Sequence, residues 1–296
     1  MTAAMNPPTT EPRLSRVQCL AARGLHRMAY WEWGDPASKR VLVCVHGLTR
    51  QGRDFDTLAR AMQGEFRVVC PDVAGRGESD RLADPSGYQV PAYVADMVTL
   101  LARLDAESVT WIGTSMGGLI GMVLASLPQS PIRRLVLNDV GPALDASGIA
   151  RIGAYVGLPL TWASEEEAAD YLLTISKGFG PHSREQWLAL TRPMLRRDGD
   201  RFRLHYDPAL GIPLRAVTPE AAAAGQAALW AAYDAIRCPT LVLRGADSDL
   251  LSATTAKAMT ERGPKARLHE FAGVGHAPTL ITPNQVDVVR EFLLTP

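Results

Sequence analysis

The chain lacks several features that would mark whole classes of protein. No run approaches the roughly 18 apolar residues of a membrane-spanning helix. The N-terminal segment MTAAMNPPTTEPRLSR contains no apolar stretch like the core of a signal peptide. Basic and acidic residues balance at 31 each, and no basic run stands out. We therefore expect a soluble protein that binds neither nucleic acid nor a membrane.

Cysteine is scarce and shows no metal-type spacing. Cys19, Cys44 and Cys70 fall inside expected strands, and Cys238 lies just before one. This placement predicts no metal site and buried free thiols in a reducing compartment, which points to the cytoplasm. The glycine-rich loop 71–79, PDVAGRGES, lacks the strand, G-x-G-x-x-G, helix order of a dinucleotide site and has no P-loop lysine. We expect no metal and no organic cofactor.

The stretch from Val109 to Ala125, VTWIGTSMGGLIGMVLA, places a serine between a strand pattern and a helix pattern. Glycines at 113 and 117 allow a sharp turn there, because larger side chains would collide with the neighbouring strand and helix. Ser115 is therefore predicted to stand exposed at a strand-to-helix elbow. The free N–H groups and the positive dipole end of the helix would face the space above the serine, where an oxyanion could form.

Apolar strand patterns alternate with helical patterns along most of the chain, which predicts an α/β fold with a doubly wound, mostly parallel sheet. The expected strands cover residues 16–22, 25–33, 40–46, 66–70, 109–112, 132–137, 239–244 and 265–271. Between residues 144 and 235 this alternation stops and helical patterns remain. We therefore expect a flexible tail over 1–15, a core over 16–143 and 236–296, and an inserted helical cap, or lid, over 144–235.

Residue types suited to nucleophilic catalysis follow one another along the chain. A serine hydroxyl is a poor nucleophile until a base accepts its proton, and the base needs a carboxylate that fixes its tautomer. After Ser115 the chain offers Asp247 and Asp249 at the end of an expected strand. His276 follows in a glycine-rich loop after the last expected strand.

Five segments together resemble the α/β-hydrolase superfamily over about residues 25 to 295. They are VCVHGLT, PDVAGRGESD, GTSMGG, LVLRGADSDLL and GVGHAP. The chain order of serine, aspartate and histidine matches that superfamily, and the helical cap lies in the usual place. The resemblance implies an α/β-hydrolase sheet, a catalytic triad and no cofactor.

The resemblance also implies a role for the residues around the elbow. Ser115 would be the nucleophile and His276 the base, while Leu48 and Met116 would supply the backbone N–H groups of an oxyanion hole. His46 lies in the same loop as Leu48. We interpret His46 as a residue that shapes this loop rather than as a base.

The identity of the triad acid has three candidates. Many relatives place the acid three residues after the glycine of the loop 245–251, where this chain has Ser248. We favour Asp249, because Ser-Asp-Leu-Leu resembles the acid turn of one esterase-like branch. Asp247 is interpreted as a solvated turn residue. Asp139 is the remaining candidate, since some relatives carry the acid at the end of the preceding strand.

The function implied by the resemblance is the hydrolysis of carboxylic esters of small, largely apolar substrates through an acyl-enzyme on Ser115. Haloalkane dehalogenases and epoxide hydrolases of this fold carry aspartate at the elbow, so the serine excludes those reactions. Two alternatives stay open. One is a C–C bond hydrolase of meta-cleavage-type dienoic keto acids, although Thr114 and Ala277 depart from its pattern. The other is a small-molecule receptor on the same fold.

Candidate substrate contacts lie after the oxyanion loop and in the cap. Arg50 is placed to meet a substrate carboxylate or to pair with Asp54 or Asp56. The basic segment 196–213 is interpreted as a solvated face. The partner is expected to be a small-molecule ester, and a homodimer stays open. Four aromatic residues are candidate liners, although the same spacing is typical of ordinary core: Trp162, Trp187, Trp230 and Tyr233.

Overall fold

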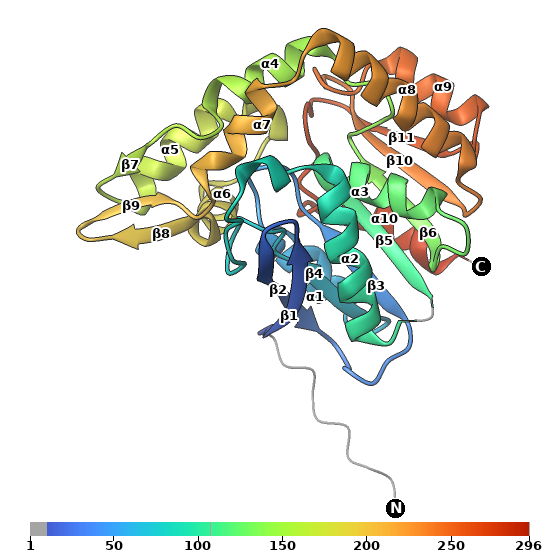
Figure 1. The fold of residues 1–296 in the computed structure, drawn as a ribbon, viewed down its shortest axis with the longest axis horizontal. Helices are drawn as coiled ribbons and strands as arrows, with labels where there is room; N and C mark the ends of the chain where they lie inside the picture. The colour runs from blue at the N-terminus through green and yellow to red at the C-terminus, as the bar shows by residue number, and fades with distance from the viewer. Residues whose placement is uncertain (1–10, 107, 296) are drawn as a thin grey trace, which may run out of the picture.

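The computed structural model describes residues 11–106 and 108–295, and its centre is an eight-stranded sheet (Figure 1). In spatial order the strands are β1 (Arg13–Ala21), β2 (Gly24–Trp33), β4 (Arg67–Pro71), β3 (Val41–Val45), β5 (Val109–Thr114), β6 (Ile132–Asn138), β10 (Thr240–Gly245) and β11 (Arg267–Phe271). The pairs β1–β2 and β2–β4 are antiparallel, and all the others are parallel. The mostly parallel α/β sheet is confirmed.

Strand β3 shows how the sheet separates two hydrophobic layers. Val41, Val43 and Val45 face one core, whereas Leu42 and Cys44 face the other, because successive side chains of a strand point to opposite faces. Helices α1 (Asp56–Met62) and α10 (Pro283–Leu294) cover the second face. The first face is covered by α2 (Val90–Leu104), α3 (Met116–Ser126), α8 (Pro219–Ala235) and α9 (Ala253–Glu261).

The segment between β6 and α8 forms an insertion that projects from one side of the sheet (Figure 1). Its elements are α4 (Ala146–Tyr155), β7 (Thr161–Trp162), α5 (Glu165–Ile175), α6 (Arg184–Thr191), β8 (Leu195–Asp198), β9 (Arg201–Leu204) and α7 (Gly211–Arg215). Ser164 and Ser183 cap α5 and α6, since each hydroxyl accepts an N–H from the first turn.

The cap differs from the sequence prediction in two respects. It is not purely helical, because β7, β9 and β8 form a small antiparallel sheet within it. Alternation was too short there to stand out from the turn signals. The predicted cap also included α8, but this helix packs against α3 and contributes Tyr233 to the core of the first face. Helix α8 therefore belongs to a core layer.

The predicted tail also needs correction at its end, because β1 begins at Arg13 and pairs with β2 from that residue onward. Residues 1–10 of the tail lie outside the described residues. In the described part of the chain, no helix combines the length and the apolar character needed to cross a bilayer.

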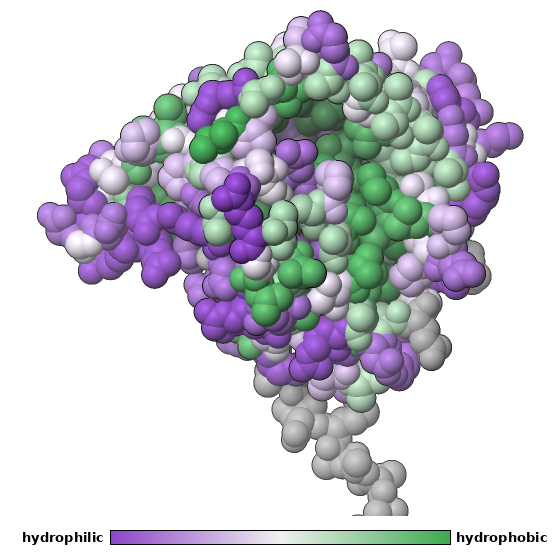
Figure 2. Space-filling view, viewed as in Figure 1, coloured by the Kyte–Doolittle hydropathy of each residue, from purple (hydrophilic) through white to green (hydrophobic). Residues whose placement is uncertain are grey.

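The hairpin β8–β9 carries the basic segment. Figure 2 shows hydrophilic residues over this end of the insertion, and residues 197–201 are exposed. The interpretation of this segment as a solvated face is confirmed for residues 196–201. It is wrong for Tyr206, Asp207 and Leu210, which are buried.

Candidate active site

Ser115 occupies a strained turn between β5 and α3. Its backbone has φ 50° and ψ −114°, a region that residues with a side chain rarely adopt, and its N–H donates to the Asn138 carbonyl at 3.0 Å. A Cβ atom at Gly117 would lie 2.0 Å from the Val45 carbonyl oxygen. At Gly113 it would lie 2.2 Å from the backbone of Gly117. The glycines therefore permit the close packing that lifts the serine, as the sequence predicted.

Three side chains form a continuous hydrogen-bonded chain that starts at this turn. The distance from Ser115 Oγ to His276 Nε2 is 3.1 Å, and that from His276 Nδ1 to Asp139 Oδ2 is 2.7 Å. With Nδ1 protonated, the imidazole donates to the carboxylate and its Nε2 can accept the serine proton. The carboxylate is fully buried and the imidazole is largely so. This is the geometry required for an activated serine.

Asp139 is held by contacts from the neighbouring strand β10 and from the turn that follows it. Its Oδ1 accepts the Gly245 N–H at 2.8 Å, and its Oδ2 accepts the Ser248 hydroxyl at 2.6 Å. Its own N–H donates to the Leu243 carbonyl at 2.8 Å. Three donors, including His276, thus converge on one buried carboxylate and fix its orientation.

The prediction that Asp249 orients the histidine is wrong. Asp249 forms a bidentate ion pair with Arg151 of the cap, at 2.5 and 2.8 Å. Hydrogen bonding from this arginine holds the pKa of Asp249 below its ordinary value. Asp247 is exposed and makes no hydrogen bond to the histidine either.

The reason lies in two adjacent parallel strands that end at the same edge of the sheet. An acid follows each strand there, Asp139 after β6 and Asp249 after β10. The contacts of Ser248 determine which of the two meets His276. Its hydroxyl donates to Asp139 and accepts the N–H groups of Leu250 and Leu251, so the turn directs Asp249 toward the cap. Serine at the usual position of the acid was the signal available in the sequence, since it leaves that position without a carboxylate.

The two predicted oxyanion donors flank the serine. Leu48 lines the cleft above Ser115, and Met116 is the first residue of α3. In the described part of the chain, neither N–H group donates a hydrogen bond to another residue. Both donors are therefore available to a ligand oxygen.

Arg76 supports this region and was missed by the sequence prediction. The side chain is buried, and its Nε donates to the Leu48 carbonyl at 2.8 Å. Its Nη1 donates to the Ala74 carbonyl and the Tyr93 hydroxyl. Arg76 thus fixes the peptide that carries one of the two amides. A buried arginine of this kind is not distinguishable from a solvated one in a glycine-rich loop.

His46 shapes the loop, as we predicted. Its Nδ1 donates to the Gly47 carbonyl at 2.7 Å, and its Nε2 accepts the Val73 N–H at 3.0 Å. The ring is completely buried, and this burial lowers its pKa from 6.5 to about 3. It is therefore neutral at physiological pH, and both of its nitrogens are engaged in holding the loops after β3 and β4.

The cleft in front of Ser115 is lined mainly by apolar side chains of the cap. Arg50 and Arg151 are the charged groups in the lining, apart from His276. Arg50 pairs with Asp54, which is the alternative we left open for it. The principal apolar liners are Ile152, Tyr155, Leu172, Ile175 and Phe179.

None of the four predicted aromatic liners contacts this cleft. Trp187 lies in the cap's own core and donates to the Ala169 carbonyl. Trp162 packs against Tyr171, again inside the cap. Tyr233 is fully buried between α8 and α9, and Trp230 packs beside it. These residues are core, because helical spacing marks a buried face without saying what covers it.

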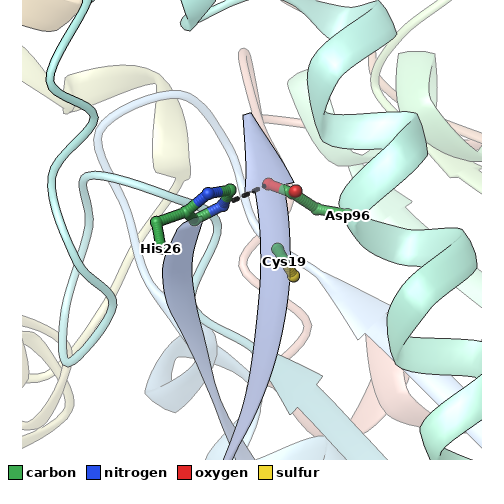
Figure 3. Close-up of side chains that lie close together, drawn as sticks. All are labelled: Cys19, His26 and Asp96. Atoms are coloured by element: carbon green, nitrogen blue, oxygen red, sulfur yellow. Dashed lines mark hydrogen bonds and ion pairs between the residues drawn. The ribbon is translucent and has the colours of Figure 1, made fainter. Parts of the chain in front are cut away.

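One cluster outside the cleft has donor atoms suited to a metal. Cys19, His26 and Asp96 are buried, and their ligand atoms all lie within 4.8 Å of one another (Figure 3). His26 Nε2 lies 3.0 Å from Asp96 Oδ2. The sequence prediction missed this group, because the residues come from β1, β2 and α2. None of the three lines the cleft. All four cysteines are free thiols, as predicted.

Comparison with known proteins identifies the family. The family model of the alpha/beta hydrolase fold matches residues 40–281. A 3-hydroxybutyrate-oligomer hydrolase from Cupriavidus necator is 58% identical over 288 residues, which cover 96% of this chain and 98% of that protein. A pimeloyl-[acyl-carrier protein] methyl ester esterase from Photobacterium profundum is 28% identical over 88% of this chain and 97% of its own length.

Solved structures agree with the sequence matches. An alpha/beta hydrolase from Novosphingobium aromaticivorans has a TM-score of 0.85 and is 35% identical, with 96% of this chain and 98% of that chain covered. The family model spans most of the chain, and the three similar proteins named above are a hydrolase, an esterase and an alpha/beta hydrolase. The protein therefore belongs to the α/β-hydrolase family and is a hydrolase.

Proposed function

We propose that the protein hydrolyses carboxylic esters through an acyl-enzyme on Ser115. The observation that carries this proposal is the hydrogen-bonded chain from Ser115 through His276 to Asp139 at the elbow. His276 takes the serine proton as the hydroxyl attacks the ester carbonyl, and it returns the proton to the leaving alcohol. Asp139 orients the imidazole and stabilises its protonated form.

The amides of Leu48 and Met116 support the second part of the mechanism. They would donate to the oxygen that becomes negative when the serine attacks. Water then attacks the acyl-enzyme with His276 again as the base, which releases the acid and restores Ser115. Apart from the ester and water, every group in this cycle belongs to the chain.

For the substrate we propose short esters of hydroxy acids, in particular 3-hydroxybutyrate oligomers. The relative from Cupriavidus necator is named for this activity, and it aligns with nearly the whole chain. The apolar lining of the cleft is consistent with a chain that carries methyl groups.

The test combines turnover with labelling. The wild-type protein is expected to release 3-hydroxybutyrate from the linear trimer and to be phosphonylated at Ser115 by a fluorophosphonate. Ser115→Ala should reduce turnover by at least about 10⁴-fold and abolish labelling. Ser126→Ala, at the far end of helix α3, is the matched control and should retain both.

If Ser115→Ala retained both turnover and labelling, the acyl-enzyme on Ser115 would be refuted. A protein that is phosphonylated yet inert toward every ester would support the C–C bond hydrolase. A protein that is neither labelled nor active, but is stabilised by a small ligand, would support the receptor.

A further inference from the structure

The two arginines that line the cleft differ in how completely their donors are used. Arg50 is largely buried, and its Nε and Nη2 donate to Asp54 at 2.5 and 2.7 Å. Its Nη2 also reaches the Leu190 carbonyl, and its Nη1 contacts the Met194 sulfur. A substrate carboxylate would have to break several buried contacts to bind here. Arg50 is therefore a structural residue of the cleft wall.

Arg151 has a partner that a ligand can replace more easily. It comes from α4 of the cap and pairs with Asp249, which follows β10 of the core. Both side chains are 37% exposed. An ion pair with this exposure contributes little net free energy, because water solvates the separated charges well. A second carboxylate that enters the cleft can therefore take the place of Asp249 at the guanidinium.

The guanidinium is also well suited to that exchange. It presents planar N–H groups that match both oxygens of a carboxylate, as its bidentate contact with Asp249 shows. Arg151 and Ser115 line the same cleft, so a bound ester can reach both. The rest of the lining is mainly apolar and would exclude water from the ion pair once a ligand fills the space.

We propose that Arg151 is the subsite for the free carboxylate of an anionic ester substrate, and that Asp249 occupies this subsite in the empty enzyme. The inference rests on the proposed function and adds a direction to it. In a 3-hydroxybutyrate oligomer, the terminal carboxylate belongs to the hydroxy acid that leaves as the alcohol. Arg151 would thus select the ester next to the carboxyl end, and the enzyme would release single 3-hydroxybutyrate units from that end.

The experiment uses two substrates with one ester each, 3-acetoxybutyrate and its neutral amide, 3-acetoxybutyramide. Acetate release gives kcat/KM for both, and their quotient is the carboxylate preference. Arg151→Gln should lower this preference by about tenfold or more, since it removes a charged hydrogen-bond partner. Asp249→Asn should raise it about threefold, since it removes the competing carboxylate.

The signs of the two effects separate a binding role from a structural one. Arg151→Gln and Asp249→Asn both break the link between cap and core, so a pair with only a structural role would shift the preference in the same direction in both variants. Two further variants complete the comparison. The double variant should show the low preference of Arg151→Gln. Arg184→Gln is the matched control, because Arg184 also pairs with an aspartate in the cap but does not line the cleft.

An unchanged preference in Arg151→Gln, or shifts of the same sign in both single variants, would overturn the subsite. If the wild type still released acetate from the amide, ester hydrolysis would stand without it. If the wild type hydrolysed neither substrate nor any other ester, the proposed function would fail, and the subsite would fall with it.

Discussion

The loops beneath the cleft and the cap above it satisfy their polar groups in different ways. Beneath the cleft, His46, Asp139 and Arg76 are almost completely buried, and each donates to or accepts from several fixed partners. In the cap, Arg151 and Arg184 pair with partly exposed aspartates. Burial makes a lost partner costly, whereas exposure makes partners exchangeable. The loops beneath the cleft, which we call the floor, therefore have a fixed geometry, whereas the contacts of the cap can change.

The largest expected contrast between the two regions concerns glycine. Gly117→Ala in the floor should destabilise the fold by at least about 3 kcal/mol, because the new methyl group would meet the backbone of Val45. Gly153→Ala in α4 of the cap should stabilise it by about 0.5 to 1 kcal/mol, because nothing lies within 4 Å of that position and alanine favours the helix. Urea unfolding of both variants measures the difference. Equal changes in the free energy of unfolding in the two variants would contradict the difference between floor and cap.

A smaller effect is expected from His46, with a clear dependence on pH. His46→Leu leaves the Val73 N–H without its acceptor and should cost about 2 kcal/mol at pH 7. Burial lowers the pKa of folded His46 to about 3, below its ordinary 6.5, so the native state binds fewer protons than the unfolded state. The stability contribution of this group is therefore fully present above pH 6.5 and is lost as the pH falls toward 3.

The measurement is the free energy of unfolding of both proteins between pH 7 and pH 4. The wild type should lose about 1.4 kcal/mol per pH unit through this group. The leucine variant lacks that loss, so the gap between the two proteins should close near about pH 5. Asp72 is also buried nearby, which raises its pKa to about 6, but it is common to both proteins and cancels in the difference. A gap that stays constant with pH would show that His46 is not held neutral.

The elbow and the histidine could be predicted because their signals are local. A strand, two glycines around a serine and a helix follow one another within Val109 to Ala125, and close packing of the backbone leaves few other arrangements. The alternation of strands and helices predicted the sheet for a similar reason. His46 was also interpreted correctly, since it precedes a glycine in the same loop as Leu48.

The acid and the cleft lining could not be fixed from the sequence, because they depend on distant contacts. Asp139 and Asp249 follow adjacent parallel strands, and one serine hydroxyl decides which of them meets His276. The cap aromatics have helical spacing that fits a cleft and a core equally well. Arg151 was not singled out, because its place above Ser115 depends on how the cap folds over the sheet.

The most direct test of this account compares the two acids in the same assay. We predict that Asp139→Asn lowers kcat for 3-acetoxybutyramide by about 10⁴-fold, since the imidazole loses the carboxylate that fixes its tautomer. Asp249→Asn should change this kcat by less than about threefold, because its partner is a partly exposed arginine. Thermal melting of both variants verifies that they are folded. A large loss in Asp249→Asn with near-normal turnover in Asp139→Asn would contradict the central claim that Asp139 is the acid of the site.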